Sequence, residues 1–128
     1  MYEKRVKFSE PKRDTGYIDI PMVLFTDPVL SEISIDAKFM YSILFDILQR
    51  RSYDNGWVDD KGRIYVMTRP DELKRSFRNS VERTKEVLAE LDQKGLIEWK
   101  RCALGGPDMI YLMNIFAYAE NNTGRQKA

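Results

Sequence analysis

Apolar side chains recur at helical spacing in two stretches of the chain. The first stretch predicts a central helix over about Ile35 to Arg51, with Ser34 as its N-cap. Its apolar positions are Ala37, Met40, Tyr41, Leu44, Ile47 and Leu48. The second stretch predicts a helix over about Val81 to Lys94, capped by Ser80 and closed by Gly95. Both helices have an apolar face and are expected to pack in one core.

A shorter helix is predicted just before the second stretch. Thr68 and Asp71 match a capping pattern, and Pro70 fits a first helical turn, so this helix is expected to end near Phe77. Residues 78–80 then form a three-residue turn between the two helices.

Alternating or β-branched stretches predict strands on either side of these helices. Tyr17–Ile20 is expected to be a short strand that stops at Pro21. Trp57–Val66 is predicted to be a hairpin, because two β-prone runs flank the turn signal at residues 60–62. Leu96–Arg101 and Met109–Met113 are predicted strands, joined by a glycine- and proline-containing turn at residues 103–108.

The order of short helix, turn, longer helix and hairpin is typical of a winged helix-turn-helix. We therefore expect an α+β fold of this kind, with an additional N-terminal strand or hairpin. Residues 17–117 would form one DNA-binding domain, residues 1–16 a flexible basic arm, and residues 118–128 a linker or tail. The second helix of such a pair normally enters the major groove of DNA.

Composition narrows the chemistry that the chain can perform. It has 128 residues, 15.1 kDa, no histidine and one cysteine, Cys102, which excludes histidine-based catalysis, an internal disulfide and the usual zinc sites. No phosphate-cradling glycine loop and no carboxylate pair with metal-ligand spacing is found. We expect no enzymatic activity, metal or cofactor. Neither a signal peptide nor a membrane-spanning run is seen, so a cytoplasmic protein is expected.

Charge is balanced overall but concentrated locally. The chain has 21 basic and 20 acidic residues, whereas residues 74–85 hold five basic residues and one acid, Glu82. This distribution is typical of a surface that binds phosphates. Predicted base contacts are Asn79, Ser80, Arg83 and Lys85. Predicted phosphate contacts are Lys74, Arg75, Arg78, Lys100 and Arg101.

An ordered set of short motifs resembles one known family. The motifs are Ile20–Phe25, Ser34–Lys38, Asn55–Asp59, Gly62–Tyr65, Gly95–Glu98 and Leu104–Tyr111. Over about residues 17–115, the chain resembles the N-terminal domain of RepA-type replication initiators, which plasmids of low-GC Gram-positive bacteria encode. The family's DNA-reading positions correspond to residues 78–80, Arg83 and Lys85. A basic residue and an asparagine would be expected near Gly106 and Asp108, so Arg101 is the better candidate in the wing.

The resemblance implies binding to repeated double-stranded sites in a plasmid origin. It also implies a separate C-terminal domain that recruits host replication proteins. Self-association is expected, since origin repeats must be held together, with Trp57–Val66 and Tyr17–Ile20 as candidate surfaces. Two other functions fit the same residues: a winged-helix transcriptional regulator, and an adaptor that docks a protein of the replication machinery. Trp57 and Trp99 are expected in the core rather than on bases.

Overall fold

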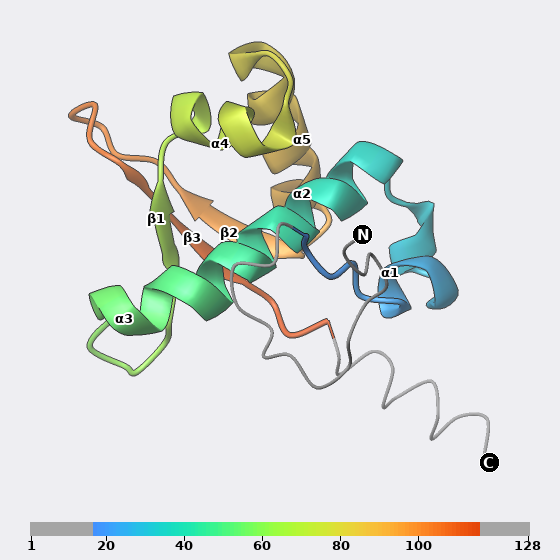
Figure 1. Cartoon of the computed structure of the whole chain (residues 1–128), viewed down its shortest axis with the longest axis horizontal. Coiled ribbons are helices and arrows are strands. Elements are labelled where there is room, and N and C mark those ends of the chain that lie inside the picture. The colour runs from blue at the N-terminus through green and yellow to red at the C-terminus, as the bar shows by residue number, and fades with distance from the viewer. Residues whose placement is uncertain (1–16, 116–128) are drawn as a thin grey trace, which may run out of the picture.

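A three-stranded antiparallel sheet carries all the long helices on one of its faces (Figure 1). The computed structural model describes residues 17–115. The central strand is β3 (Asp108–Leu112), which pairs with β1 (Val66–Thr68) on one side and with β2 (Ile97–Lys100) on the other. Ile110 lies opposite both Val66 and Trp99, which fixes the register of the sheet.

The central helix begins where predicted but ends later. In α2 (Ile35–Ile47), the Ser34 hydroxyl accepts a hydrogen bond from the Ala37 N–H at 3.0 Å. The helix then continues through a π-helical turn (Leu48–Ser52) into α3 (Tyr53–Asn55) and ends at Gly56, whose φ is +66°. The predicted end at Arg51 was therefore four residues early. The helix ends at Gly56 because glycine has no Cβ and adopts the left-handed conformation without strain.

The helix pair of the predicted helix-turn-helix is present, and one predicted cap is wrong. Thr68 lies buried at the end of β1, and the N-cap of α4 (Pro70–Phe77) is Arg69, which makes no side-chain capping bond. Pro70 at the start of α4 presets the helical φ without a cap. In α5 (Val81–Gln93) the predicted cap is correct, because the Ser80 hydroxyl accepts from the Arg83 N–H at 3.0 Å.

The predicted N-terminal strand is absent. Residues 17–20 have no regular structure, and Ile18 packs partly against the core beside α2, where no sheet edge is available for pairing. After Pro21 the chain forms the short α1 (Val23–Thr26) and a 3-10 turn (Leu30–Glu32). Asp27 is buried and holds this turn, since its carboxylate accepts from the N–H groups of residues 29 and 30.

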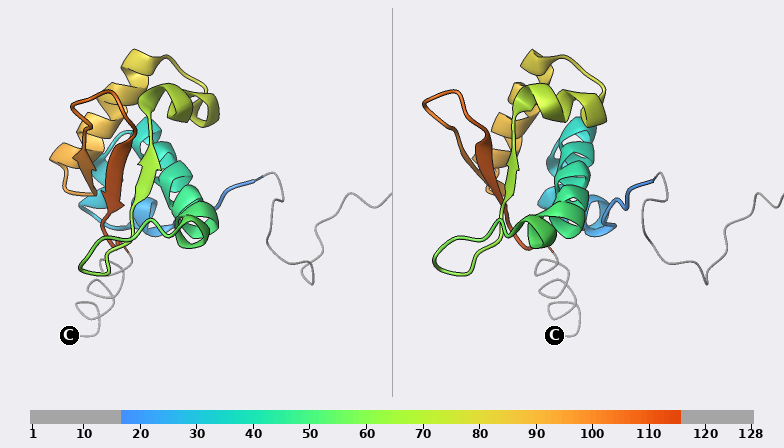
Figure 2. Two further views of the ribbon diagram at one scale, coloured as in Figure 1. Left: turned by 90° about the vertical axis from the view of Figure 1, so that its left-hand side faces the viewer. Right: turned by 60° about the vertical axis from the view of Figure 1, so that its left-hand side comes forward.

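The predicted hairpin at Trp57–Val66 is only partly formed. One bridge, between Val58 and Ile64, is all that pairs its two arms, and Val66 already belongs to β1. Asp59 shapes the turn instead, because its carboxylate accepts from the N–H groups of Lys61 and Arg63 at 2.9 and 2.8 Å. The result is a loop that projects from the end of the sheet opposite the β2–β3 turn (Figure 2).

One core lies between the helices and the inner face of the sheet. Its fully buried members include Leu44 of α2, Leu73 of α4, Leu88 of α5 and Ile110 of β3. A second, polar link joins α5 to α2: the Glu90 carboxylate accepts from the Ser34 N–H and hydroxyl at 2.8 and 2.7 Å. Packing and this link together fix α5 while the start of α5 stays at the surface, beside the β2–β3 turn (Figure 2). The architecture is the expected winged helix-turn-helix, with β2 and β3 as the wing.

Candidate nucleic-acid interface

The end of α4 and the turn after it form a cationic surface. Lys74, Arg75, Arg78 and Asn79 line a shallow depression of about 460 Å³, and all four are exposed. Within residues 17–115, none of these three cations forms an ion pair. Charges that are not neutralised by neighbouring carboxylates are available to an external anion, such as a phosphodiester.

Arg78 occupies a backbone conformation that usually belongs to glycine. Its φ and ψ are +60° and +46°, and its N–H closes the end of α4 by donating to the Lys74 carbonyl at 2.6 Å. A left-handed conformation costs an ordinary L-residue roughly 1–2 kcal/mol. The fold thus keeps a cation at the tip of the helix-turn-helix where a glycine would be less strained, which is a pattern seen at functional sites.

Asn79 and Ser80 organise the start of α5 with part of their hydrogen-bonding capacity. The side-chain oxygen Oδ1 of Asn79 accepts from the Ser80 N–H at 2.9 Å, and the Ser80 hydroxyl oxygen caps the helix. The Asn79 amide group and the Ser80 hydroxyl proton are donors that these bonds do not use. Both side chains are exposed, so these donors face outward at the beginning of the predicted reading helix.

Arg83 differs from the other predicted contacts because carboxylates surround it. Its Nε and Nη2 donate to Asp36 at 3.1 and 2.9 Å, and its Nη1 donates to Glu86 at 3.1 Å. The bonds to Asp36, and then those to Glu86, raise the pKa of Arg83 above its ordinary value. Arg83 therefore stays charged, and a DNA base would have to compete with two carboxylates for its N–H groups.

A second cationic region lies between α5 and the wing. A cleft of about 360 Å³ is lined by Lys85 from α5, by Arg101 directly after β2, and by Arg69 directly before α4. Sequence analysis missed Arg69. Its place in the chain, between a strand and the proline that opens a helix, was the available signal, but only the fold brings it close to Lys85 and Arg101.

Two neighbouring wing residues that were predicted together lie on different sides of β2. Arg101 lines the cleft, and its guanidinium carbon is 4.0 Å from the centre of the Trp99 ring. Lys100 lies on the outer side of the sheet, over the Tyr111 ring at 5.4 Å and 3.6 Å from a Glu98 oxygen. Residues that follow each other in a strand point to opposite faces, which separates these two cations.

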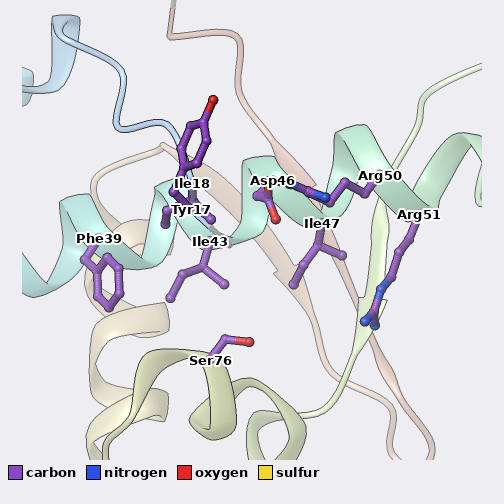
Figure 3. Close-up of a pocket in the computed structure, with 9 residues that line it drawn as sticks. All are labelled: Tyr17, Ile18, Phe39, Ile43, Asp46, Ile47, Arg50, Arg51 and Ser76. Atoms are coloured by element: carbon purple, nitrogen blue, oxygen red, sulfur yellow. Dashed lines mark hydrogen bonds and ion pairs between the residues drawn. The ribbon is translucent and has the colours of Figure 1, made fainter. Parts of the chain in front are cut away.

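A third groove is of a different kind, because apolar side chains form its wall. It has a volume of about 520 Å³ and lies between residues 17–18, α2 and α4, with Phe39, Ile43 and Ile47 on its wall and Arg50 and Arg51 at its rim (Figure 3). Asp46 in this groove is already paired with Arg50 at 2.8 Å. Among residues 17–115, no cluster of three or more acidic or cysteine side chains is placed to hold a metal ion.

The family profile described as "Replication initiator protein A (RepA) N-terminus" matches residues 16–125 of the chain. The chain belongs to this family. Three solved structures share its fold. One, described as the structure of a Rep–DNA complex, is 33% identical with a TM-score of 0.68, and the match covers 77% of this chain and 75% of that one. No curated protein sequence matches the chain.

The other two structures extend the similarity over more of this RepA-family chain. The N-terminal domain of a DNA binding protein is 29% identical, with a TM-score of 0.67 and coverage of 84% of this chain and 86% of that one. The structure of an MDR initiator is 27% identical, with a TM-score of 0.66 and coverage of 84% and 88%. Together they confirm the winged-helix fold and the family that the sequence motifs indicated.

Asp108 shows how this RepA-family chain departs from the expected wing. It is buried at the start of β3, and its two oxygens accept from the Trp99 indole N–H and the Cys102 N–H, both at 2.9 Å. The carboxylate therefore supports the wing from within.

Within residues 17–115, no helix combines the length and apolar character that crossing a membrane requires.

Proposed function

We propose that this chain is the sequence-specific, double-stranded DNA-binding domain of a plasmid replication initiator. The observation that carries the proposal is the exposed, unpaired cation group of Lys74, Arg75 and Arg78 at the tip of a helix-turn-helix, in a chain of the RepA family. The solved Rep–DNA complex with the same fold supports it.

In this proposal the start of α5 enters the major groove. Lys74, Arg75 and Arg78 hold phosphates on one side of the groove and Arg101 on the other, which sets the register of the helix. Asn79, Ser80 and Lys85 then face base edges, and Asn79 can pair with an adenine through its amide. Arg83 joins them when it exchanges its carboxylate partners for a guanine.

The domain would act by binding alone, without catalysing a reaction and without a cofactor. Repeated sites in the origin would gather several copies, and self-association would hold the repeats together. Host replication proteins would be recruited through another part of the initiator. Opening of the duplex would then depend on bending, on multimers or on those host proteins.

Fluorescence anisotropy on labelled duplexes tests the proposal. One series tiles the gene that encodes this chain, a shuffled duplex serves as the control, and salt is varied. We expect one repeated segment to bind at least about a thousandfold tighter than the shuffled duplex at physiological salt. Equal and weak binding to every duplex would overturn sequence-specific recognition.

Two matched variants locate the binding surface. Replacing Lys74, Arg75 and Arg78 together by alanine should abolish tight binding and flatten the dependence of log K on log salt by about 0.9 for each lost phosphate contact. Replacing Arg51, Lys61 and Lys94 removes the same charge from exposed positions elsewhere and should change binding little. If both triple variants lose affinity equally, net charge and not this surface governs binding. A chain that binds no duplex but still docks a replication protein would be an adaptor.

A further inference from the structure

Two hydrogen bonds to the Asp108 carboxylate hold the base of the wing on either side of Arg101. Asp108 Oδ2 accepts from the Trp99 indole N–H and its Oδ1 accepts from the Cys102 N–H, both at 2.9 Å. Asp108 is 8% exposed, so both bonds are largely shielded from water. One carboxylate therefore fixes the plane of the Trp99 ring and the backbone immediately after Arg101.

The fixed ring is the platform on which Arg101 lies. The Arg101 guanidinium carbon is 4.0 Å from the ring centre of Trp99, well within the range of a cation–π contact. Trp99 is half-buried and packs partly against the core, so the platform itself is anchored. A stacked guanidinium uses its flat face for the ring and keeps its N–H groups at the edge for another acceptor.

The cleft beside this stack has the composition of a site for one anion. Arg69, Lys85 and Arg101 reach it from three different elements, and within the described residues none of them forms an ion pair. Asp71 and Asp108 also line the cleft, and Asp108 is engaged by the wing. Arginine guanidinium groups bind phosphate oxygens through paired N–H donors, so a small cleft with two arginines suits a single phosphodiester group.

We propose that this cleft takes one backbone phosphate of the bound duplex, held by Arg101 and Arg69, while Lys85 on the α5 side of the cleft keeps its place at the base edges. Trp99 and Asp108 are positioning residues: they hold the Arg101 guanidinium over the cleft before DNA arrives. This proposal rests on duplex binding by the chain. Because the guanidinium is already stacked and aimed, less side-chain entropy is lost when the phosphate binds.

The test pairs variants with duplexes that each carry one neutral methylphosphonate in place of a phosphate. For the natural chain, we expect one position where the neutral linkage lowers affinity roughly tenfold, the scale of a charge-assisted contact. Arg101→Ala should lose this penalty at the same position and retain the penalties at all others. A general loss of folding would not move one position selectively.

The positioning residues are tested at that same position. Trp99→Leu removes the platform and should reduce the local penalty to a few-fold. Trp99→Phe keeps a stacked ring and should recover most of it. Asp108→Asn and Arg101→Lys, which keeps the charge but not the planar group, should give intermediate values. Tyr53→Leu is the control, because Tyr53 is an exposed aromatic residue of α3 that does not line the cleft, and it should leave the penalty intact.

The outcomes separate this proposal from the one that it rests on. A natural chain that binds no duplex overturns the proposed function itself. A chain that binds, but whose penalties are all unchanged in Arg101→Ala, overturns the phosphate site alone. If the penalty depends on Arg101 but is unchanged in Trp99→Leu, the phosphate site stands and the positioning role of Trp99 is overturned. Circular dichroism and melting temperature identify any variant that does not fold, and Trp99→Phe with Arg101→Lys then decides the outcome.

Discussion

The Arg83 guanidinium donates from both Nε and Nη2 to one oxygen of Asp36, at 3.1 and 2.9 Å. This pair joins the first turn of α5 to the first turn of α2, and Glu86 accepts a third bond at 3.1 Å. The residue predicted to read a base is thus bound to the body of the domain. In the proposed complex with DNA, the strength of a base contact from Arg83 would depend on how easily Arg83 leaves Asp36.

Removing Arg83 should affect recognition more than stability. Its side chain and that of Asp36 are 36% and 42% exposed, so solvent screens the pair and we expect Arg83→Ala to change the free energy of unfolding little. Affinity for the specific duplex should fall by about 1–3 kcal/mol, with relaxed discrimination at one base pair. Anisotropy against single-base variants of the site measures this. An equal loss on random duplexes would make Arg83 a phosphate contact.

Removing the carboxylate partner should have the opposite effect on binding. Asp36→Asn takes away the acceptor that competes with a base and should tighten binding to the specific duplex severalfold. Asp46→Asn is a matched control, because it removes the same charge from α2 where Asp46 pairs with Arg50. If Asp36→Asn weakens specific binding, the Asp36 pair orients Arg83 for reading and does not restrain it.

Arg78 allows stability and binding to be separated. Glycine relieves the left-handed backbone at this position, so we expect Arg78→Gly to leave the free energy of unfolding equal or to raise it by up to about 1 kcal/mol. Duplex affinity should nevertheless fall, and the salt dependence should flatten by about one phosphate contact. Arg78→Ala should lose the same affinity without gaining stability. Unchanged affinity in both variants would show that the cation is incidental there.

Periodicity and capping chemistry were sufficient to predict α2 and α5, whereas the predicted cap of α4 was wrong and α1 was not predicted. The spacing of Leu44 and Leu88 with their neighbours, together with Ser34 and Ser80 as caps, is determined by local physics and is readable from the chain. Strand pairing is not local. Residues 17–20 and Val66 have similar β-prone character, but only Val66 pairs with an edge of β3. The strand predicted at residues 17–20 was therefore wrong, and Val66 pairs with β3 and not within the predicted hairpin.

The sequence predicted which cationic residues form the candidate site, but not which other side chains lie next to them. The concentration of cations from Lys74 to Lys85 is visible in the sequence, and the fold exposes most of it. Asp36 is 47 positions from Arg83, and Arg69 is 32 positions from Arg101, with which it lines one cleft. Neither proximity leaves a pattern in one sequence. Arg101 and Trp99, which stack on each other, are only two residues apart, but the hydrogen bond from Trp99 to Asp108 of the next strand has no local pattern either.

The two serine caps should differ in their contribution to stability. Ser80→Ala removes one capping bond and should cost about 1 kcal/mol. Ser34→Ala also removes the hydroxyl bond to Glu90, a charged acceptor on α5, and should cost about 2–3 kcal/mol. Urea unfolding of both variants measures the difference. Equal losses would show that the link from Ser34 to Glu90 contributes nothing beyond the cap.

Asp59 should make the loop after α3 sensitive to strong acid. Burial alone raises the pKa of Asp59, but bonds from the Arg63 N–H and side chain, the Tyr111 hydroxyl and the Lys61 N–H outweigh it and lower the pKa from 3.8 to about 2. Because the folded-state pKa is below the unfolded value, the stabilisation is complete above pH 3.8 and is lost as the pH falls through about 2.

The variant Asp59→Asn tests this dependence directly. It should be less stable than the natural chain at pH 7, and its stability should fall less steeply between about pH 4 and pH 2, because the linked proton uptake is gone. Carboxyl chemical shifts followed by NMR should place the midpoint of Asp59 near 2. A midpoint close to 3.8 would mean that the loop does not hold the carboxylate in solution. Tyr111→Phe, which removes one of the donors, should move the midpoint upward.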